Sequence, residues 1–134
     1  MSDCVFCGDP SRAGEIVFEN DVAWVIVHPD WACRGHVMVA AREHVENIAQ
    51  LSDWASFAAI YARAERVLLE LTRTDRAIVL KLGIATPHLH LHVYPVSAEL
   101  DRNAVMRIIN AEVRVERDDA LVAAMRSAMT DVAP

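Results

Sequence analysis

Three histidines that alternate with apolar residues constrain this chain more than any other stretch of its sequence. They lie in the run His88-Leu89-His90-Leu91-His92-Val93-Tyr94. Alternation with a period of two is typical of a β-strand and places the three imidazoles on one face of that strand. At about 3.3 Å per residue, neighbouring histidines stand about 6.6 Å apart, too far to chelate one metal by themselves. The row can instead present imidazoles to an extended anionic ligand. Pro87 and Pro95 are expected to bound the strand.

Length and charge limit the kind of partner. The 134 residues are 54% hydrophobic, which predicts one domain with a substantial core. The net charge of -6 and the lack of a basic run argue against a nucleic acid polymer as partner, but a local site for a compact phosphorylated ligand is compatible with them. No apolar run reaches the ~20 residues that span a bilayer, and no signal-peptide pattern opens the chain. We therefore expect a cytoplasmic protein with no membrane partner.

The pattern of elements favours an α+β fold with an antiparallel sheet, because short strands follow one another with one long helix inserted. That helix is expected over residues 53–71, with Ser52 as its N-cap. Residues 1–96 are expected to form the core domain. Residues 97–134 are expected to form a helical extension, with helices near 104–110 and 118–129, packed on the core or on a partner subunit. The other strands are expected at residues 15–18, 22–27, 36–40 and 76–82.

Two cysteines at the N-terminus have the spacing of a zinc knuckle. Cys4 and Cys7 offer two thiolates, and His44 and His88 are candidates to complete a tetrahedral Cys2His2 site. Four protein ligands would leave no open position, so such a Zn²⁺ would be structural. An odd cysteine count in a reducing compartment also favours metal binding over a disulfide framework. The alternative is that both cysteines are reduced and pack as small hydrophobic residues.

The histidines are also candidates for nucleophilic catalysis at phosphorus. A neutral imidazole is a good nucleophile near pH 7. A central histidine with a histidine on either side can be oriented by one neighbour, while the other stabilises charge on the phosphate. The sequence contains no Gly-x-Ser-x-Gly elbow and no glycine-rich phosphate loop. Histidine chemistry on a phosphorylated substrate is therefore the favoured interpretation.

The run from His88 to Tyr94 fits the pattern His-φ-His-φ-His-φ-φ, and by it the chain resembles the histidine triad (HIT) superfamily of nucleotide hydrolases and transferases. The resemblance is closest to its zinc-bearing bacterial-type branch. Upstream, Cys4-x-x-Cys7, the run from Gly35 to Val39, and Arg42-x-His44-Val45 follow the family's order. The resemblance covers about residues 3–96.

This resemblance implies a sheet of about five antiparallel strands, one long helix and a homodimer. It implies that His90 attacks the α-phosphorus of a nucleotide-like phosphoanhydride or phosphoramidate and carries a nucleotidyl group that water then releases. His92 would lie against the phosphate, and His36 would support the same pocket. The zinc ligands that the resemblance implies are Cys4, Cys7, His44 and His88.

Two departures from the family pattern concern the substrate. Many members carry an Asp for the ribose hydroxyls at the end of the second strand, where this chain has His28, and Asp30 is the candidate substitute. Many members also have a longer glycine-rich loop before the triad. This chain has the shorter segment 81–87, in which Lys81 and Thr86 are candidate phosphate contacts.

Two other functions stay open at this point. The chain would be a nucleotide- or phosphate-binding regulatory module if the pocket had lost turnover. It would be a zinc-dependent redox or regulatory protein if Cys33, in the loop before His36, were a reactive thiol. The leading hypothesis is a dimeric, zinc-stabilised histidine triad hydrolase or transferase.

Overall fold

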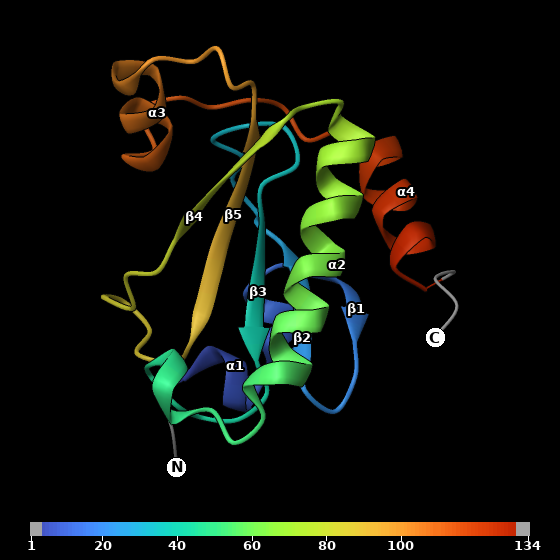
Figure 1. Cartoon of the computed structure of the whole chain (residues 1–134), viewed down its shortest axis with the longest axis vertical. Helices are drawn as coiled ribbons and strands as arrows, with labels where there is room; N and C mark the ends of the chain where they lie inside the picture. The colour runs from blue at the N-terminus through green and yellow to red at the C-terminus, as the bar shows by residue number, and fades with distance from the viewer. Residues whose placement is uncertain (1–3, 131–134) are drawn as a thin grey trace.

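A computed structural model describes residues 4–130 of the chain (Figure 1). One curved sheet stands between two helices on one side and a shorter helix with the N-terminal turn on the other. The fold is α+β, as the sequence predicts. Of the helices within residues 4–130, none is both long and apolar enough to cross a bilayer. In chain order the elements are α1 (Val5–Gly8), η1 (Pro10–Arg12), β1 (Glu15–Glu19), β2 (Ala23–Val27), β3 (Val37–Ala41), η2 (Ile48–Gln50), α2 (Trp54–Thr72), β4 (Arg76–Leu80), β5 (His90–Val96), α3 (Arg102–Ile109) and α4 (Asp119–Thr130).

The five strands form one antiparallel sheet in the order β1-β2-β3-β5-β4. β5 pairs with β3 on one side and with β4 on the other, so the histidine strand lies inside the sheet rather than at its edge. In this register His90 lies opposite Ala40 and His92 lies opposite Met38. The sheet therefore holds His92 between two strands, β3 and β4, whereas His90 has a strand partner only in β3.

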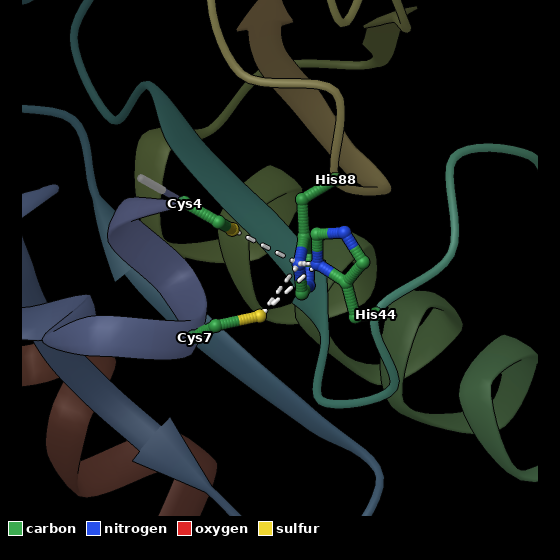
Figure 2. A group of neighbouring side chains, drawn as sticks. All are labelled: Cys4, Cys7, His44 and His88. Atoms are coloured by element: carbon green, nitrogen blue, oxygen red, sulfur yellow. Dashed lines mark hydrogen bonds between the residues drawn. The ribbon is translucent and has the colours of Figure 1, made fainter. Parts of the chain in front are cut away.

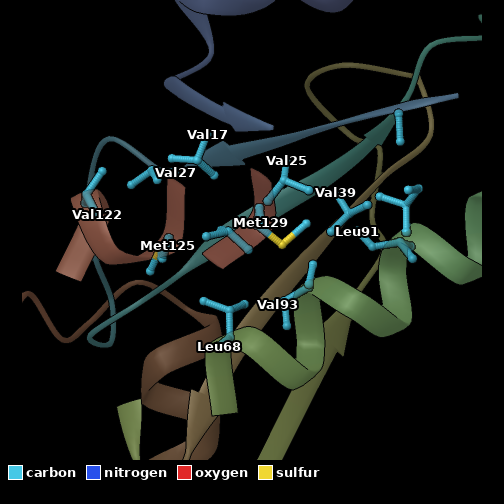
Figure 3. Packing of buried hydrophobic residues seen from close by; sticks show 14 of the residues in the cluster. Val17, Val25, Val27, Val39, Leu68, Leu91, Val93, Val122, Met125 and Met129 are labelled. Atoms are coloured by element: carbon cyan, nitrogen blue, oxygen red, sulfur yellow. The ribbon is translucent and has the colours of Figure 1, made fainter. Parts of the chain in front are cut away.

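One face of the sheet carries the main hydrophobic core (Figure 3). Because side chains alternate along a strand, Val25, Val39, Leu91 and Val93 all point to this face. The helix α2 covers them with the buried residues Phe57, Ile60, Ala64 and Leu68, which recur at helical spacing. The helix α4 lies beside α2 and adds Leu121, Val122, Met125 and Met129. This arrangement leaves the opposite face for the histidines.

The opposite face carries two smaller clusters of buried residues, one at each end. Cys4 and Phe6 of the N-terminal turn pack on Trp24, Ile26 and Met38. At the other end, Ile108 of α3 packs with Cys33, Tyr94 and Val96. The histidines lie between these two clusters. Residues 97–130 thus contact both faces of the sheet, α3 on the histidine face and α4 on the core face.

Several local predictions differ from the structure. Asp53, not Ser52, is the N-cap of α2, and its carboxylate accepts the backbone N–H of Ser56. Pro95 does not end the histidine strand, because β5 continues to Val96 and Pro95 pairs with Ala77 of β4. His88 precedes β5 instead of belonging to it. The physical reason lies in its side-chain contacts, which draw His88 toward the N-terminal cysteines.

Candidate active site and metal centre

The four candidate zinc ligands, Cys4, Cys7, His44 and His88, lie together in space (Figure 2). The Sγ of Cys4 lies 3.3 Å from the Nδ1 of His88, and the Sγ of Cys7 lies 3.0 Å from the Nδ1 of His44. The two Nδ1 atoms of His44 and His88 are 3.0 Å apart. Zinc–nitrogen and zinc–sulfur bonds of about 2.0–2.3 Å imply tetrahedron edges of about 3.3–3.8 Å. The distance of 3.3 Å falls in this range and the two of 3.0 Å lie just below it, and two thiolates with two imidazoles are a donor set that tetrahedral zinc sites use.

The surroundings of His88 prepare its Nδ1 for a metal. Its Nε2 lies 2.6 Å from the backbone carbonyl oxygen of Ala41. A carbonyl can only accept, so Nε2 carries the hydrogen and Nδ1 keeps its lone pair. Burial lowers the pKa of His88, which keeps the ring in the neutral form that binds metals. Desolvation and the neighbouring Cys4 raise the pKa of Cys7, an effect that a cation between the sulfurs would reverse.

The same logic assigns the tautomer of His90. Its Nδ1 lies 2.7 Å from the backbone carbonyl oxygen of His88, so Nδ1–H donates and Nε2 carries the free lone pair. The ring of Phe6 lies against the imidazole, with centroids 5.0 Å apart. His90 is half-buried. These contacts orient one nucleophilic nitrogen, which is the arrangement that attack on an electrophile needs.

His92 and His36 form a hydrogen-bonded pair. The Nε2 of His36 lies 3.0 Å from the Nδ1 of His92, and within residues 4–130 the buried Nδ1 of His36 has no hydrogen-bond partner. An unpartnered N–H is costlier to bury than an unpartnered lone pair, because a donor that has lost water keeps its full desolvation cost. His36 therefore donates through Nε2–H, and His92 accepts at Nδ1. The Nε2–H of His92 is left as a donor for an anion.

Burial keeps this pair uncharged. It lowers the pKa of His36 to about 2 and that of His92 to about 4. Both rings are therefore neutral near pH 7. The centroid of His92 lies 5.2 Å from that of His90, with the planes at 64°. One nucleophilic nitrogen and one N–H donor thus lie side by side on a single strand.

His28, which follows β2, extends the group. Its ring stacks on His36 with centroids 4.3 Å apart and planes 8° apart. Its Nδ1 lies 3.0 Å from the backbone nitrogen and 2.8 Å from the carbonyl oxygen of Asp30. Desolvation lowers its pKa. Nitrogens of His28, His36 and His92 lie within 4.8 Å of one another, a spacing that would admit a metal. However, two parallel rings cannot both direct in-plane lone pairs at one ion, so the stacking of His28 on His36 argues against a metal site among these three rings.

The other predicted substrate contacts have different surroundings. The carboxylate of Asp30 lies 3.2 Å from the guanidinium of Arg114. Lys81 is exposed in the loop after β4, and the backbone carbonyl of Thr86 accepts the N–H of His88. Their roles in substrate binding stay predictions. The sequence singles out His28 only as a departure from the family's ribose Asp, with no role of its own. It does not single out Phe6 at all, and the only signal for Phe6 is its place inside the Cys-x-x-Cys turn.

Cys33 is buried between Ala32, Tyr94 and Ile108. Desolvation raises the pKa of its thiol to about 12, so the thiolate that redox chemistry requires is scarce near neutral pH. The structure gives no support to the hypothesis of a reactive Cys33.

Known proteins share the fold of this chain. Residues 10–99 match the family model of the HIT domain. Among solved structures, a hypothetical histidine triad nucleotide-binding protein from Sulfolobus tokodaii strain 7 is 18% identical, with a TM-score of 0.68, over 96% of this chain and 93% of that one. A Zn-bound histidine triad family protein from Mycobacterium smegmatis is 22% identical, with a TM-score of 0.67, over 96% and 94%. A HIT family hydrolase from Clostridium thermocellum is 21% identical, with a TM-score of 0.58, over 76% and 97%.

Proposed function

Because this chain belongs to the HIT domain family, we propose that it is a hydrolase or nucleotidyl transferase that acts through a covalent intermediate on His90. The substrate class is a nucleotide-like phosphoanhydride or phosphoramidate. The similarity to a protein named as a HIT family hydrolase agrees with this class of activity. One observation carries the proposal: the hydrogen bond from His90 Nδ1 to the His88 carbonyl leaves Nε2 as the nucleophile.

The reaction divides into two displacements. In the first, the lone pair of His90 Nε2 forms a bond to phosphorus while the bond to the leaving group breaks, and the leaving group takes a proton from water. The Nε2–H of His92 donates to a phosphoryl oxygen, where negative charge grows in the transition state. In the second, the oxygen of water forms a bond to phosphorus and the water gives up a proton to solvent. The nitrogen–phosphorus bond breaks with its electron pair returning to His90 Nε2, and the monophosphate leaves. In a transferase reaction, another acceptor takes the place of water in this second step.

We further propose that Cys4, Cys7, His44 and His88 hold a structural Zn²⁺ ion. The similarity to a Zn-bound histidine triad family protein supports this assignment, as does the donor geometry. The ion would join the N-terminal turn to the segment that leads into β5 and would take no part in the displacement steps. His88 is therefore a ligand, and its carbonyl orients His90.

The test is intact-mass measurement after brief mixing with an adenosine phosphoramidate or a dinucleoside polyphosphate. Wild type should show a transient adduct of one nucleotidyl group, mapped to His90. His90→Ala should show none and should release no monophosphate. An adduct that persists in His90→Ala would overturn the assignment of the nucleophile.

A nucleotide- or phosphate-binding module with little turnover is the second candidate. One observation favours it: the Asp30 carboxylate is paired with Arg114 and the Lys81 side chain is exposed, so within residues 4–130 neither side chain has a described hydrogen bond or ion pair to a histidine. Saturable binding of the same compounds by wild type, without adduct or product over hours, would decide for this candidate.

We also propose a cytoplasmic homodimer with residues 1–96 as its catalytic core and 97–134 as an extension. The edge strand β4 offers unpaired backbone groups, and Val79 within it is 44% exposed. Leu82 and Ile84, in the loop that follows, are 56% and 82% exposed. Sedimentation equilibrium should give twice the chain mass for wild type, and Val79→Lys should shift the protein toward monomer.

A further inference from the structure

A segment of the C-terminal extension lies along the loop that separates His28 from His36. We call residues 113–118 the strap and residues 29–35 the pocket loop. Arg114 pairs with Asp30 at 3.2 Å, and the backbone N–H of Val115 donates to the carbonyl of Trp31 at 2.9 Å. Further along, Arg34 pairs with Asp118 at 3.0 Å. All three contacts join residues 84 apart in sequence, so strap and pocket loop run parallel and in register.

The pocket loop is held from its inner side as well. Trp31 is buried in the main core, and Cys33 is buried against Tyr94 and Ile108. Gly35 has a φ of +95°, and a Cβ at this position would lie 2.9 Å from Thr72 Cγ2. The loop therefore has little freedom at Trp31, Cys33 and Gly35. Its exposed stretch at Pro29 and Asp30 depends on the strap.

That exposed stretch is the part that holds His28. Both backbone groups of Asp30 lie within hydrogen-bond distance of the His28 Nδ1. The His28 ring in turn stacks on His36, which donates to His92. A displacement of Asp30 would therefore change the orientation of the His28 ring first, and the phosphate-facing pair second.

We propose that the strap is a positioning element of the active site, and that His28, which it holds in place, contacts the part of the substrate attached to the transferred phosphorus. The identity of the substrate in this inference rests on the proposed function. The contact between strap and pocket loop does not depend on that function. Arg114 acts through the Asp30 backbone and is a positioning residue, whereas His28 would touch the substrate. His28 is half-buried on the same face as His92, with centroids 5.6 Å apart.

The test reverses one charge and then restores the pair. Arg114→Glu places two carboxylates together. Both partners are largely exposed, at 78% and 61%, so the expected effect is modest. We expect KM to rise about two- to five-fold, the range of an exposed ion pair, with kcat within about two-fold. Asp30→Arg combined with Arg114→Glu should restore KM. Arg107→Glu, an equal charge change at an exposed position of α3, should leave KM unchanged.

A double-mutant cycle decides whether the effect passes through His28. In a His28→Ala background, Arg114→Glu should have no further effect on KM, because the ring that it positions is gone. If Arg114→Glu still raises KM there, or if the charge swap fails to restore it, the proposal is wrong.

A second measurement does not depend on turnover. Long-range ¹H–¹⁵N spectra of the imidazoles should show shifts for His28 and His36 in Arg114→Glu, and none for His44. Unchanged His28 resonances would overturn the inference even in an active enzyme. Shifted His28 resonances in a protein that neither binds nor converts nucleotides would keep the positioning role and remove the proposed function.

Discussion

His36 donates a hydrogen bond from Nε2 to the Nδ1 of His92, across 3.0 Å, from a position that is 3% exposed. This bond turns the remaining N–H of His92 toward the ligand side of the sheet. A neutral imidazole in water populates both tautomers, and the bond from His36 selects the one in which His92 carries its hydrogen on Nε2.

Loss of this donor should impair the chemical step more than binding. We expect His36→Ala to lower kcat by roughly ten-fold, the cost of about one hydrogen bond in the transition state, with KM within about three-fold. Stopped-flow measurement of adduct formation would check this. His36→Asn, which keeps a donor, should recover part of the rate. A His36→Ala enzyme with wild-type kcat would contradict the tautomer assignment.

Acid should destabilise the protein through the same pair. Burial lowers the pKa of His92 to about 4, below the ordinary value of 6.5. The unfolded state then binds more protons than the folded state between these values, so the unfolding free energy falls as pH falls from about 6.5. Between pH 7 and pH 5, His92 should contribute roughly 1–3 kcal/mol to the difference in unfolding free energy measured with urea, and His36, whose pKa burial lowers to about 2, a similar amount. The difference should shrink in His92→Asn, and an equal difference in both proteins would assign it to other groups.

Removal of the proposed metal should loosen the N-terminal turn. We expect one zinc per chain by elemental analysis of metal-loaded protein. A strong chelator should lower the unfolding free energy by several kcal/mol, because binding to the folded state alone adds to stability. Cys7→Ser should lose zinc. Cys33→Ser, at a cysteine outside the cluster, should keep it, and zinc loss from Cys33→Ser would place the site elsewhere.

Gly35 should tolerate no side chain. With φ at +95°, and with an added Cβ lying 2.9 Å from Thr72 Cγ2 and 3.1 Å from Pro95 Cγ, Gly35→Ala combines backbone strain with a clash. We expect a loss of roughly 1–3 kcal/mol in chemical denaturation. Gly8→Ala is the matched control, because a Cβ there has nothing within 4 Å. Equal effects of the two substitutions would refute this explanation.

The sequence predicts an element of the fold correctly where apolar residues recur at a regular spacing. The alternation from Leu89 to Val93 and the apolar spacing from Phe57 to Leu68 predict β5 and α2, and both are present. Pro95 misleads, because a residue that ends isolated strands is accepted inside β5 next to β4. The N-cap of α2 differs by one residue, since Ser52 and Asp53 both suit that position, and the Ser52 hydroxyl instead donates to Glu43.

The site is less predictable from sequence, because its parts meet only after folding. Residue type and spacing group Cys4 and Cys7, but no local pattern shows that Asp30 pairs with Arg114 instead of facing the histidines. His28 obtains its place from the stacked ring of His36 and from the Asp30 backbone. Such contacts depend on tertiary geometry, so no repeating pattern in the sequence predicts them.

The contact between Cys4 and His88 closes a ring of polypeptide, because these residues are 84 positions apart. A zinc ion held there is a reversible cross-link over most of the domain. By chain-entropy arguments, a closure of this length costs the unfolded chain roughly 4–5 kcal/mol of conformational freedom. Unlike a disulfide, this closure opens whenever the ion departs. The lifetime of the folded chain would then depend on metal supply, independently of catalysis.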